Sequence, residues 1–300
     1  MDNMKKMTKF FALALLAGAM VSCSTEDTAS TTANGKVAVQ FTGGISVNTR
    51  AAGLAWAEGD KIGIFMTATK QPLSADAIRE GVDNVCYQSN GSIGFSPISG
   101  GKTIFFPIDG DVDFYSYYPQ TTVNDYKVAL DVTYQTKQEA IDFMYAKTEG
   151  CNKATPQVFL KFYHKLSNLV LDVQPGNGLT QEDLKKMTVT VKGQNTKATF
   201  NLADGTISGE GNPTDIKMKT TQAGKLYEAI LLPTEEASRV IEFDLNNGYD
   251  APFVWTMPAK LEGGKRYHYT VVKLSRSAVD ISGNIEPWIK AGDDNEHIAQ

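Results

Sequence analysis

The sequence predicts a mostly β protein built from two tandem β-sandwich domains. Aromatic and β-branched residues fall in short runs of alternating polarity, and turn dipeptides separate the runs. The chain has 300 residues, which is enough for two ordinary domains behind a leader. Its net charge of −5 is spread without long charged blocks, so nucleic acid is not an expected partner.

The N-terminus has the layout of a secretory signal peptide over residues 1–22. Lysines precede an uninterrupted apolar run, Phe10–Met20, which is too short for a membrane span of about 20 apolar residues. Small residues then lead to Cys23, and the stretch from Met20 resembles a bacterial lipobox, in which the cysteine is lipidated and becomes the new N-terminus. The alternative is an ordinary signal peptide whose removal leaves a soluble secreted protein.

Residues 23–35 are predicted to form a lipidated flexible tether. They are small and polar and show no apolar period. Glu26 and Asp27 resemble the acidic signal that sends some Bacteroidetes lipoproteins to the cell surface. A plain solvated linker is the alternative interpretation.

A half-buried strand is predicted next, followed by an accessible arginine. Apolar and polar residues alternate between Lys36 and Thr49, and Gly43-Gly44 are expected to interrupt the strand. Arg50 follows the strand and precedes Ala51-Ala52-Gly53. This junction is therefore expected to be flexible and uncluttered.

The N-terminal domain is assigned to residues 36–156. Asn90-Gly91 and Asp109-Gly110 are hairpin-type dipeptides, and residues 74–80 predict one or two helical turns. Further short aromatic or β-branched runs predict strands at 61–66, 84–88, 102–106, 112–118, 126–132 and 142–145.

The C-terminal domain is assigned to residues 157–300. Its first run, Val158–Leu166, changes apolar phase beyond Ser167-Asn168, which predicts a β-bulge. Thr180–Met187 is the clearest predicted helix, with Thr180 as its N-cap. Further strands are predicted at 188–191, 198–202, 227–232, 240–245, 253–256 and 267–274.

No residue is predicted to be catalytic, to bind a cofactor or to hold a metal, and an enzyme is not expected. His164 shares an apolar strand face and is interpreted as a core histidine hydrogen-bonded to backbone. The segment Asp109–Asp113 resembles the start of a calcium loop but lacks the glutamate at the twelfth position, which favours an acidic turn. A set of alternating tyrosines predicts sheet packing, with a sugar-stacking platform as the alternative: Tyr115, Tyr117 and Tyr118.

Three cysteines occur in the chain, and Cys23 belongs to the predicted anchor. Cys86 and Cys151 remain in an exported protein, where a disulfide is permitted. Spacing alone does not establish the geometry of a bond, so a Cys86–Cys151 disulfide and two free thiols both stay open.

Several motifs follow one another along the chain: the lipobox, Thr49-Arg50-Ala51, Trp56–Ile64, Phe162–Leu166, Ile230–Pro233, Gly264–Tyr269 and Ile285–Trp288. Their order resembles that of the fimbrillin-like proteins of Bacteroidales, the type V pilins and their accessory subunits, and the likeness covers nearly the whole chain. The resemblance implies two transthyretin-like β-sandwich domains, a role in fimbriae and cell adhesion, and a lipid-anchored place at the outer membrane or cell surface.

The resemblance also implies a way of assembly. In stalk pilins of that family a protease cuts after an arginine and removes the first strand, and a donor strand from the next subunit fills the groove. Arg50 matches that arginine, and Lys36–Thr49 matches the strand removed. The C-terminal run with Val279, Ile281 and Ile285 alternates as a donor strand should, or else it completes its own domain.

The implied partners are other fimbrial subunits, self or accessory, and the outer membrane through the lipid. Host or bacterial surface glycans or proteins are further candidate partners. The roles of stalk, tip and anchor subunit stay open. A solitary surface lipoprotein that binds glycans is the alternative function.

Overall fold

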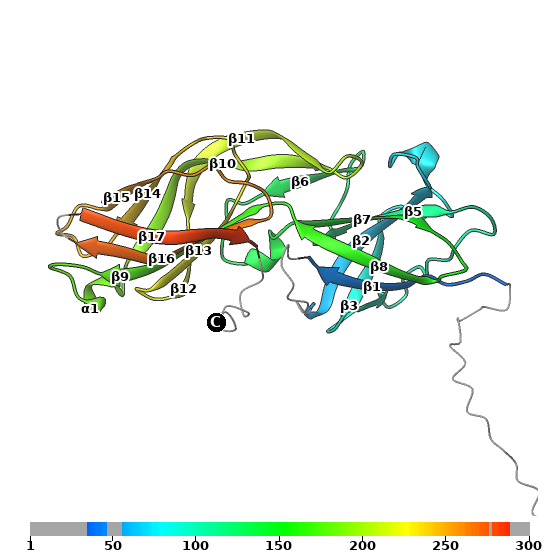
Figure 1. Cartoon of the computed structure of the whole chain (residues 1–300), viewed down its shortest axis with the longest axis horizontal. Helices are drawn as coiled ribbons and strands as arrows, with labels where there is room; N and C mark the ends of the chain where they lie inside the picture. Colours follow the sequence, from blue (N-terminus) through cyan, green and yellow to red (C-terminus); the bar gives the residue numbers. More distant parts are fainter. Residues whose placement is uncertain (1–34, 47–55, 276–277, 289–300) are drawn as a thin grey trace, which may run out of the picture.

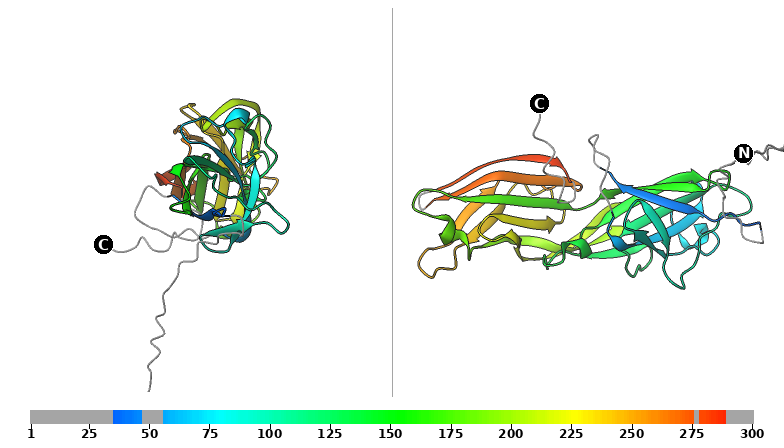
Figure 2. Two further views of the ribbon diagram at one scale, coloured as in Figure 1. Left: turned by 90° about the vertical axis from the view of Figure 1, so that its right-hand side faces the viewer. Right: turned by 90° about the horizontal axis from the view of Figure 1, so that it is seen from below.

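The structure is a computed structural model that describes residues 35–46, 56–275 and 278–288. The chain is mostly β, and its strands form a closed barrel and two five-stranded sheets. The barrel and the sheet pair lie end to end along the long axis of the molecule (Figures 1 and 2). The predicted mostly β fold class is therefore confirmed, and the N-terminal strands form a closed barrel where a sandwich was predicted. Within the described ranges, no helix is long and apolar enough to cross a membrane.

The barrel closes because its first strand lies between two others. β1 pairs with β4 in antiparallel and with β8 in parallel orientation, and the full order is β1-β4-β3-β2-β5-β7-β8. The strands are β1 (Gln40–Ile45), β2 (Glu58–Ala68), β3 (Val85–Asn90), β4 (Gly94–Pro97), β5 (Val112–Tyr118), β7 (Met144–Cys151) and β8 (Gln157–His164).

The two sheets of the C-terminal body bury one large apolar cluster. One sheet has the order β11-β10-β14-β15, and β6 also pairs with β10; the other has the order β12-β13-β9-β16-β17. The strands of the first are β6 (Lys127–Asp131), β10 (Thr188–Asn201), β11 (Thr206–Lys217), β14 (Arg239–Asp244) and β15 (Phe253–Met257). Those of the second are β9 (Ser167–Pro175), β12 (Lys219–Gln222), β13 (Leu226–Leu231), β16 (Lys265–Ser275) and β17 (Ala278–Pro287).

The barrel and the C-terminal body share apolar contacts. Tyr117 of β5 belongs to the cluster of the C-terminal body, and its ring stacks 6.0 Å from that of Phe143. Phe143 in turn lies 4.7 Å from Phe200 of β10, and Tyr145 Oη donates to the Leu202 carbonyl oxygen at 2.8 Å. β5 is buried on both faces, and its Tyr115 and Tyr117 belong to the same apolar cluster as Val128 of β6.

The strand β8 lies in the barrel, whereas the sequence assigns everything from residue 157 to the C-terminal domain. β8 pairs with β1 and β7, and the chain passes to the other body only after His164. The phase change near Ser167 marks this crossing and is not a β-bulge, because β8 and β9 belong to different sheets. A period-two pattern shows which face a residue takes, but not which sheet its strand joins.

Most other predicted elements are present, with four kinds of difference. The run 102–106 forms only an isolated bridge at Phe105, and β10 is one continuous strand where two were predicted. The helix α1 (Gln181–Leu184) is shorter than predicted but begins at Thr180 with a capping box. β4, β11 and β12 were not predicted, and the remaining helical turns are η1 (Ala75–Ala77) and η2 (Gln138–Ala140).

Candidate functional site

The first strand, β1, is an integral part of the barrel core. Val39, Phe41 and Ile45 are only 6%, 3% and 8% exposed. The Phe41 ring meets the rings of Tyr87 and Phe114 edge-on, at centroid distances of 5.3 and 5.1 Å. The alternation of the sequence therefore predicted the buried face of this strand correctly.

Gly43-Gly44 do not interrupt β1, contrary to the prediction. Both residues pair with β8, and Gly43 lies opposite Leu160. A Cβ atom on Gly43 would lie 2.9 Å from Phe95 Cε2 and 3.1 Å from the Leu160 carbonyl oxygen. The glycine stands in the strand because the barrel interior has no room for a side chain there.

Replacing Gly43 by alanine is expected to lower the free energy of unfolding by about 1–3 kcal/mol, because the added methyl group overpacks the core. Gly44→Ala is the matched control. Its Cβ would meet only the ring of Phe159, at 3.0 Å, and that side chain is 53% exposed and free to turn outward. Urea denaturation of both variants measures the difference, and equal midpoints would show that Gly43 is not sterically required.

Trp56 fastens β1 to the rest of the barrel. Its Nε1 atom donates a hydrogen bond to the Gly43 carbonyl oxygen at 3.1 Å. Its ring packs edge-on against Phe95 and Phe162, at 5.1 and 5.0 Å. Trp56 follows Arg50 in the sequence, so a cut after Arg50 would separate it from β1. The sequence offered Trp56 only as one residue of a longer motif.

The predicted lipid-attachment residue and the predicted processing residue, Cys23 and Arg50, lie outside the described residues. The predicted donor run lies within them and forms β17, which pairs with β16. Val279 and Ile281 are half-buried against the C-terminal cluster, and Ile285 is 59% exposed. In this structure the run completes the sheet of its own body, so a donor role requires it to leave that sheet.

The residue that follows β17 is fixed at the junction of the two bodies. Trp288 is 4% exposed, and its ring stacks on that of His164 at 4.2 Å with an interplanar angle of 17°. The Trp288 amide donates to the Gly264 carbonyl oxygen at 3.1 Å. His164 is a buried core residue, as predicted, but its Nδ1 atom contacts the Asp142 carboxylate at 2.7 Å, not a backbone group.

The suggested disulfide is wrong, because Cys86 and Cys151 are both free. They lie on β3 and β7, and β2 and β5 lie between these two strands in the barrel. A disulfide requires Cα atoms within about 7 Å. Burial, and then the charges of Asp113 and Asp111, raise the pKa of Cys151 to about 11, and burial also raises the pKa of Cys86. Both thiols are therefore weak nucleophiles at neutral pH.

Asp113 has a structural role in the acidic turn. Its carboxylate accepts hydrogen bonds from Thr69 Oγ1 at 2.7 Å and from the amides of Lys70 and Gly150 at 2.9 Å each. It is 1% exposed, so these contacts satisfy a buried charge and join β5, β7 and the turn that follows β2. This supports the interpretation as an acidic turn.

The tyrosines considered for sugar stacking are buried in β5, with exposed fractions of 0% to 6%: Tyr115, Tyr117 and Tyr118. Burial raises the pKa of Tyr117 to about 12, even though its hydroxyl donates to the Thr121 carbonyl oxygen at 2.7 Å. A sugar could not reach these rings in the folded protein. The interpretation as sheet packing is confirmed.

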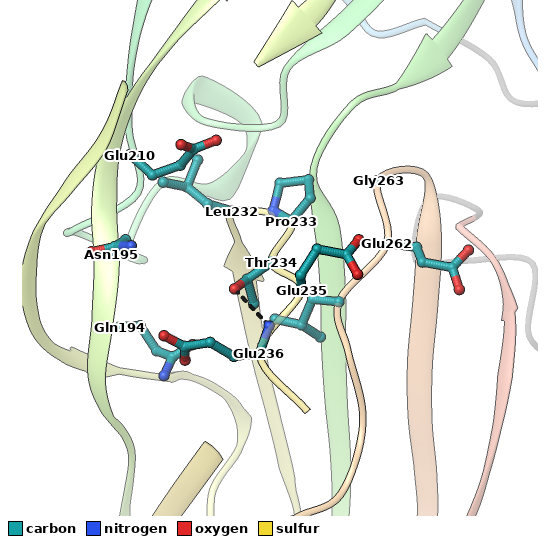
Figure 3. Close-up of a pocket in the computed structure, with 11 residues that line it drawn as sticks. Gln194, Asn195, Glu210, Leu232, Pro233, Thr234, Glu235, Glu236, Glu262 and Gly263 are labelled. Atoms are coloured by element: carbon teal, nitrogen blue, oxygen red, sulfur yellow. Dashed lines mark hydrogen bonds between the residues drawn. The ribbon is translucent and has the colours of Figure 1, made fainter. Parts of the chain in front are cut away.

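An open acidic pocket of about 500 Å³ lies in the C-terminal body, beside β10 and β11 (Figure 3). Four glutamates line it: Glu210, Glu235, Glu236 and Glu262. Thr234 Oγ1 accepts a hydrogen bond from the Glu236 amide at 3.2 Å. The lining residues include no His, Cys or Ser that a carboxylate could activate as a nucleophile.

Comparisons with known proteins agree with one another. A family model described as fimbrillin-like matches residues 49–288. A protein of Bacteroides uniformis named "Putative fimbrium subunit Fim1C" is 34% identical over 296 residues, covering 92% of this chain and 93% of that protein.

Two solved structures resemble this one in fold and sequence. A "putative cell adhesion protein" from Bacteroides uniformis has a TM-score of 0.73 and 31% identity, covering 85% of this chain and 99% of that chain. Another protein with that description, from Bacteroides ovatus, has a TM-score of 0.69 and 26% identity, covering 85% of this chain and 98% of that chain.

Proposed function

The chain belongs to the fimbrillin-like family, and from that premise we propose that it is a fimbrial subunit that assembles by replacement of its first strand. The observation that supports this proposal best is the position of β1. This short strand closes the barrel between β4 and β8, and it is the first strand of the described chain. A single cut between β1 and Trp56 would separate it from the rest of the barrel.

Loss of β1 would leave a groove with two kinds of unsatisfied surface. The edges of β4 and β8 would present unpaired backbone N–H and C=O groups, which readily pair with another chain. Removal of Val39, Phe41 and Ile45 would expose the apolar side chains that now pack against them. The lost burial costs a free energy of about 1.5–3 kcal/mol for each apolar side chain removed. Both features favour a replacement strand of matching shape.

The proposal includes the path to the cell surface. The signal peptide of residues 1–22 directs export, and lipid on Cys23 holds the precursor at the outer membrane through the tether of residues 23–35. Each buried CH₂ group of an acyl chain contributes about 0.8 kcal/mol to this attachment. Processing after Arg50 then releases both the lipid and β1, and the subunit joins a fimbrium that acts in adhesion.

Limited digestion with trypsin tests the proposal. We expect wild-type ectodomain to be cut after Arg50 and to form a ladder of polymers on a native gel, because the open groove captures a donor strand. Arg50→Ala is expected to remain monomeric. Arg79→Ala, which removes an exposed arginine elsewhere in the chain, is the matched control and should polymerise like wild type.

Two results would contradict strand replacement in this protein. One is that cut wild type stays monomeric at high concentration. The other is that Arg50→Ala polymerises as readily as Arg79→Ala, since β1 would then still be joined to its own barrel.

A further inference from the structure

The backbone of β1 is held at Gly43 from both sides. The Gly43 amide donates to the Ile93 carbonyl oxygen at 2.8 Å, and the Gly43 carbonyl oxygen accepts a hydrogen bond from Trp56 Nε1 at 3.1 Å. Both partners follow Arg50 in the sequence, so they would stay in the barrel when β1 leaves. A replacement strand would meet the same two hydrogen-bonding groups, which fix the place of its own residue at the Gly43 position.

Three buried rings close around the Gly43 position. The ring centroid of Phe95 lies 5.1 Å from that of Trp56 and 6.5 Å from that of Phe162. A Cβ atom on Gly43 would lie 2.9 Å from Phe95 Cε2 and 3.4 Å from Phe162 Cε2. Because Phe95 is 8% exposed and packs against the other two rings, it has little freedom to make room. A side chain at this point would therefore have to displace a packed ring.

The outward face of β1 is far less restricted. A Cβ atom on Gly44 would meet only the ring of Phe159, which is 53% exposed and free to turn away. The neighbouring outward residues Gln40 and Thr42 are themselves partly exposed. The groove therefore places its strictest steric limit on one inward position, the one that Gly43 now occupies.

We propose that Phe95 determines which strands the groove accepts. Its ring leaves room for a strand only if glycine stands at the Gly43 position, whatever the outward residues are. The accepted partner is a segment with glycine at that inward place and larger apolar residues at the other three, as β1 has at Val39, Phe41 and Ile45. An alternating strand that carries a side chain at the Gly43 position is rejected. This inference rests on the proposed function and adds the class of strand that the groove selects.

Synthetic peptides test this selection. The segment Val37–Thr49 contains no lysine or arginine, so trypsin leaves it intact. Wild-type ectodomain is cut with trypsin in the presence of excess fluorescent peptide, and the bound peptide is measured by size-exclusion chromatography. We expect the Gly43→Ala peptide to bind at least about 10-fold more weakly than the natural one, because the added methyl group overpacks the core. The Gly44→Ala peptide is the matched control and should bind like the natural one.

A change in the barrel tests the role of Phe95 itself. Phe95→Leu removes the Cε2 atom that meets the Cβ position, so the difference between the natural and the Gly43→Ala peptide should narrow to about threefold. A smaller difference remains because the Leu160 carbonyl oxygen still lies 3.1 Å from the added atom. Phe159→Leu shortens the ring on the outward face and should leave the original difference unchanged. The peptide comparison on the wild-type barrel tests the selection without any change in the barrel.

The outcomes separate the inference from the function on which it rests. Equal binding of the natural and Gly43→Ala peptides to the wild-type barrel, or an unchanged difference in Phe95→Leu, would overturn selection by Phe95 but leave strand replacement standing. Cut wild type that binds none of the three peptides would overturn both, because even the natural strand could not then enter the groove.

Discussion

Replacing Trp56 by alanine is expected to lower the free energy of unfolding by about 3–5 kcal/mol, because a buried tryptophan leaves a large cavity. Trp56 is 2% exposed and packs against Phe95, Tyr118 and Phe162. The change also removes the hydrogen bond that holds the Gly43 carbonyl group of β1. Urea denaturation of the uncut ectodomain measures the loss.

Trp56→Phe is the matched control for this prediction. It keeps an aromatic ring in the site but loses the hydrogen bond, whose net contribution is about 0.5–1.5 kcal/mol. We expect its loss of stability to lie between wild type and Trp56→Ala. In trypsin-treated samples, Trp56→Ala should also hold a donor strand less firmly, since the same ring lines the groove. An alanine variant as stable as wild type would show that Trp56 does not fasten β1.

Replacing Trp288 by alanine is expected to have the second largest effect, a loss of about 3 kcal/mol in the free energy of unfolding. Trp288 is buried on His164 at the end of β17, where the chain meets the junction of the two bodies (Figure 1). Its removal frees the end of an edge strand on which Val279 and Ile281 are only half-buried. We therefore expect β17 to leave its own sheet more easily in this variant.

Hydrogen exchange of the β17 amides is the measurement that separates this local effect from general instability. In Trp288→Ala, protection should fall in β17 and in its partner β16, while β1 and β8 keep the protection that they have in wild type. Trp288→Phe retains a ring that can stack on His164 and should restore most of the protection. Unchanged exchange in β17 of the alanine variant would contradict a role for Trp288 in holding the strand.

Local structure was well predicted from the sequence. The buried face of β1 followed from alternation, and the predicted hairpin dipeptide Asn90-Gly91 lies between the paired strands β3 and β4. The prediction of Thr180 as the N-cap is confirmed: its side chain accepts a hydrogen bond from the Asp183 amide within the same turn. These features depend on interactions between residues that are close together in the sequence, so a local sequence pattern is enough to predict them.

Long-range features were not predicted. The pairing of β8 with β1 depends on contacts between residues that are far apart in the chain, and the same alternation would suit either body. The state of the cysteines stayed open for the same reason, since spacing does not show that two strands lie between Cys86 and Cys151.

The role of Gly43 also needed the structure. Glycine usually weakens a strand, and only the nearby Phe95 ring and Leu160 carbonyl group explain why it is required at this point. The structure adds that Gly43 lies where the barrel core has no room for a side chain.

The central claim is that the barrel loses β1 when the protein assembles. Purified fimbria should be dissociated and the intact subunits analysed by mass spectrometry and N-terminal sequencing. The account predicts subunits that begin at Ala51 and lack the segment Lys36–Thr49, with no lipid attached. Assembled subunits that retain Phe41 and the rest of β1 would contradict it.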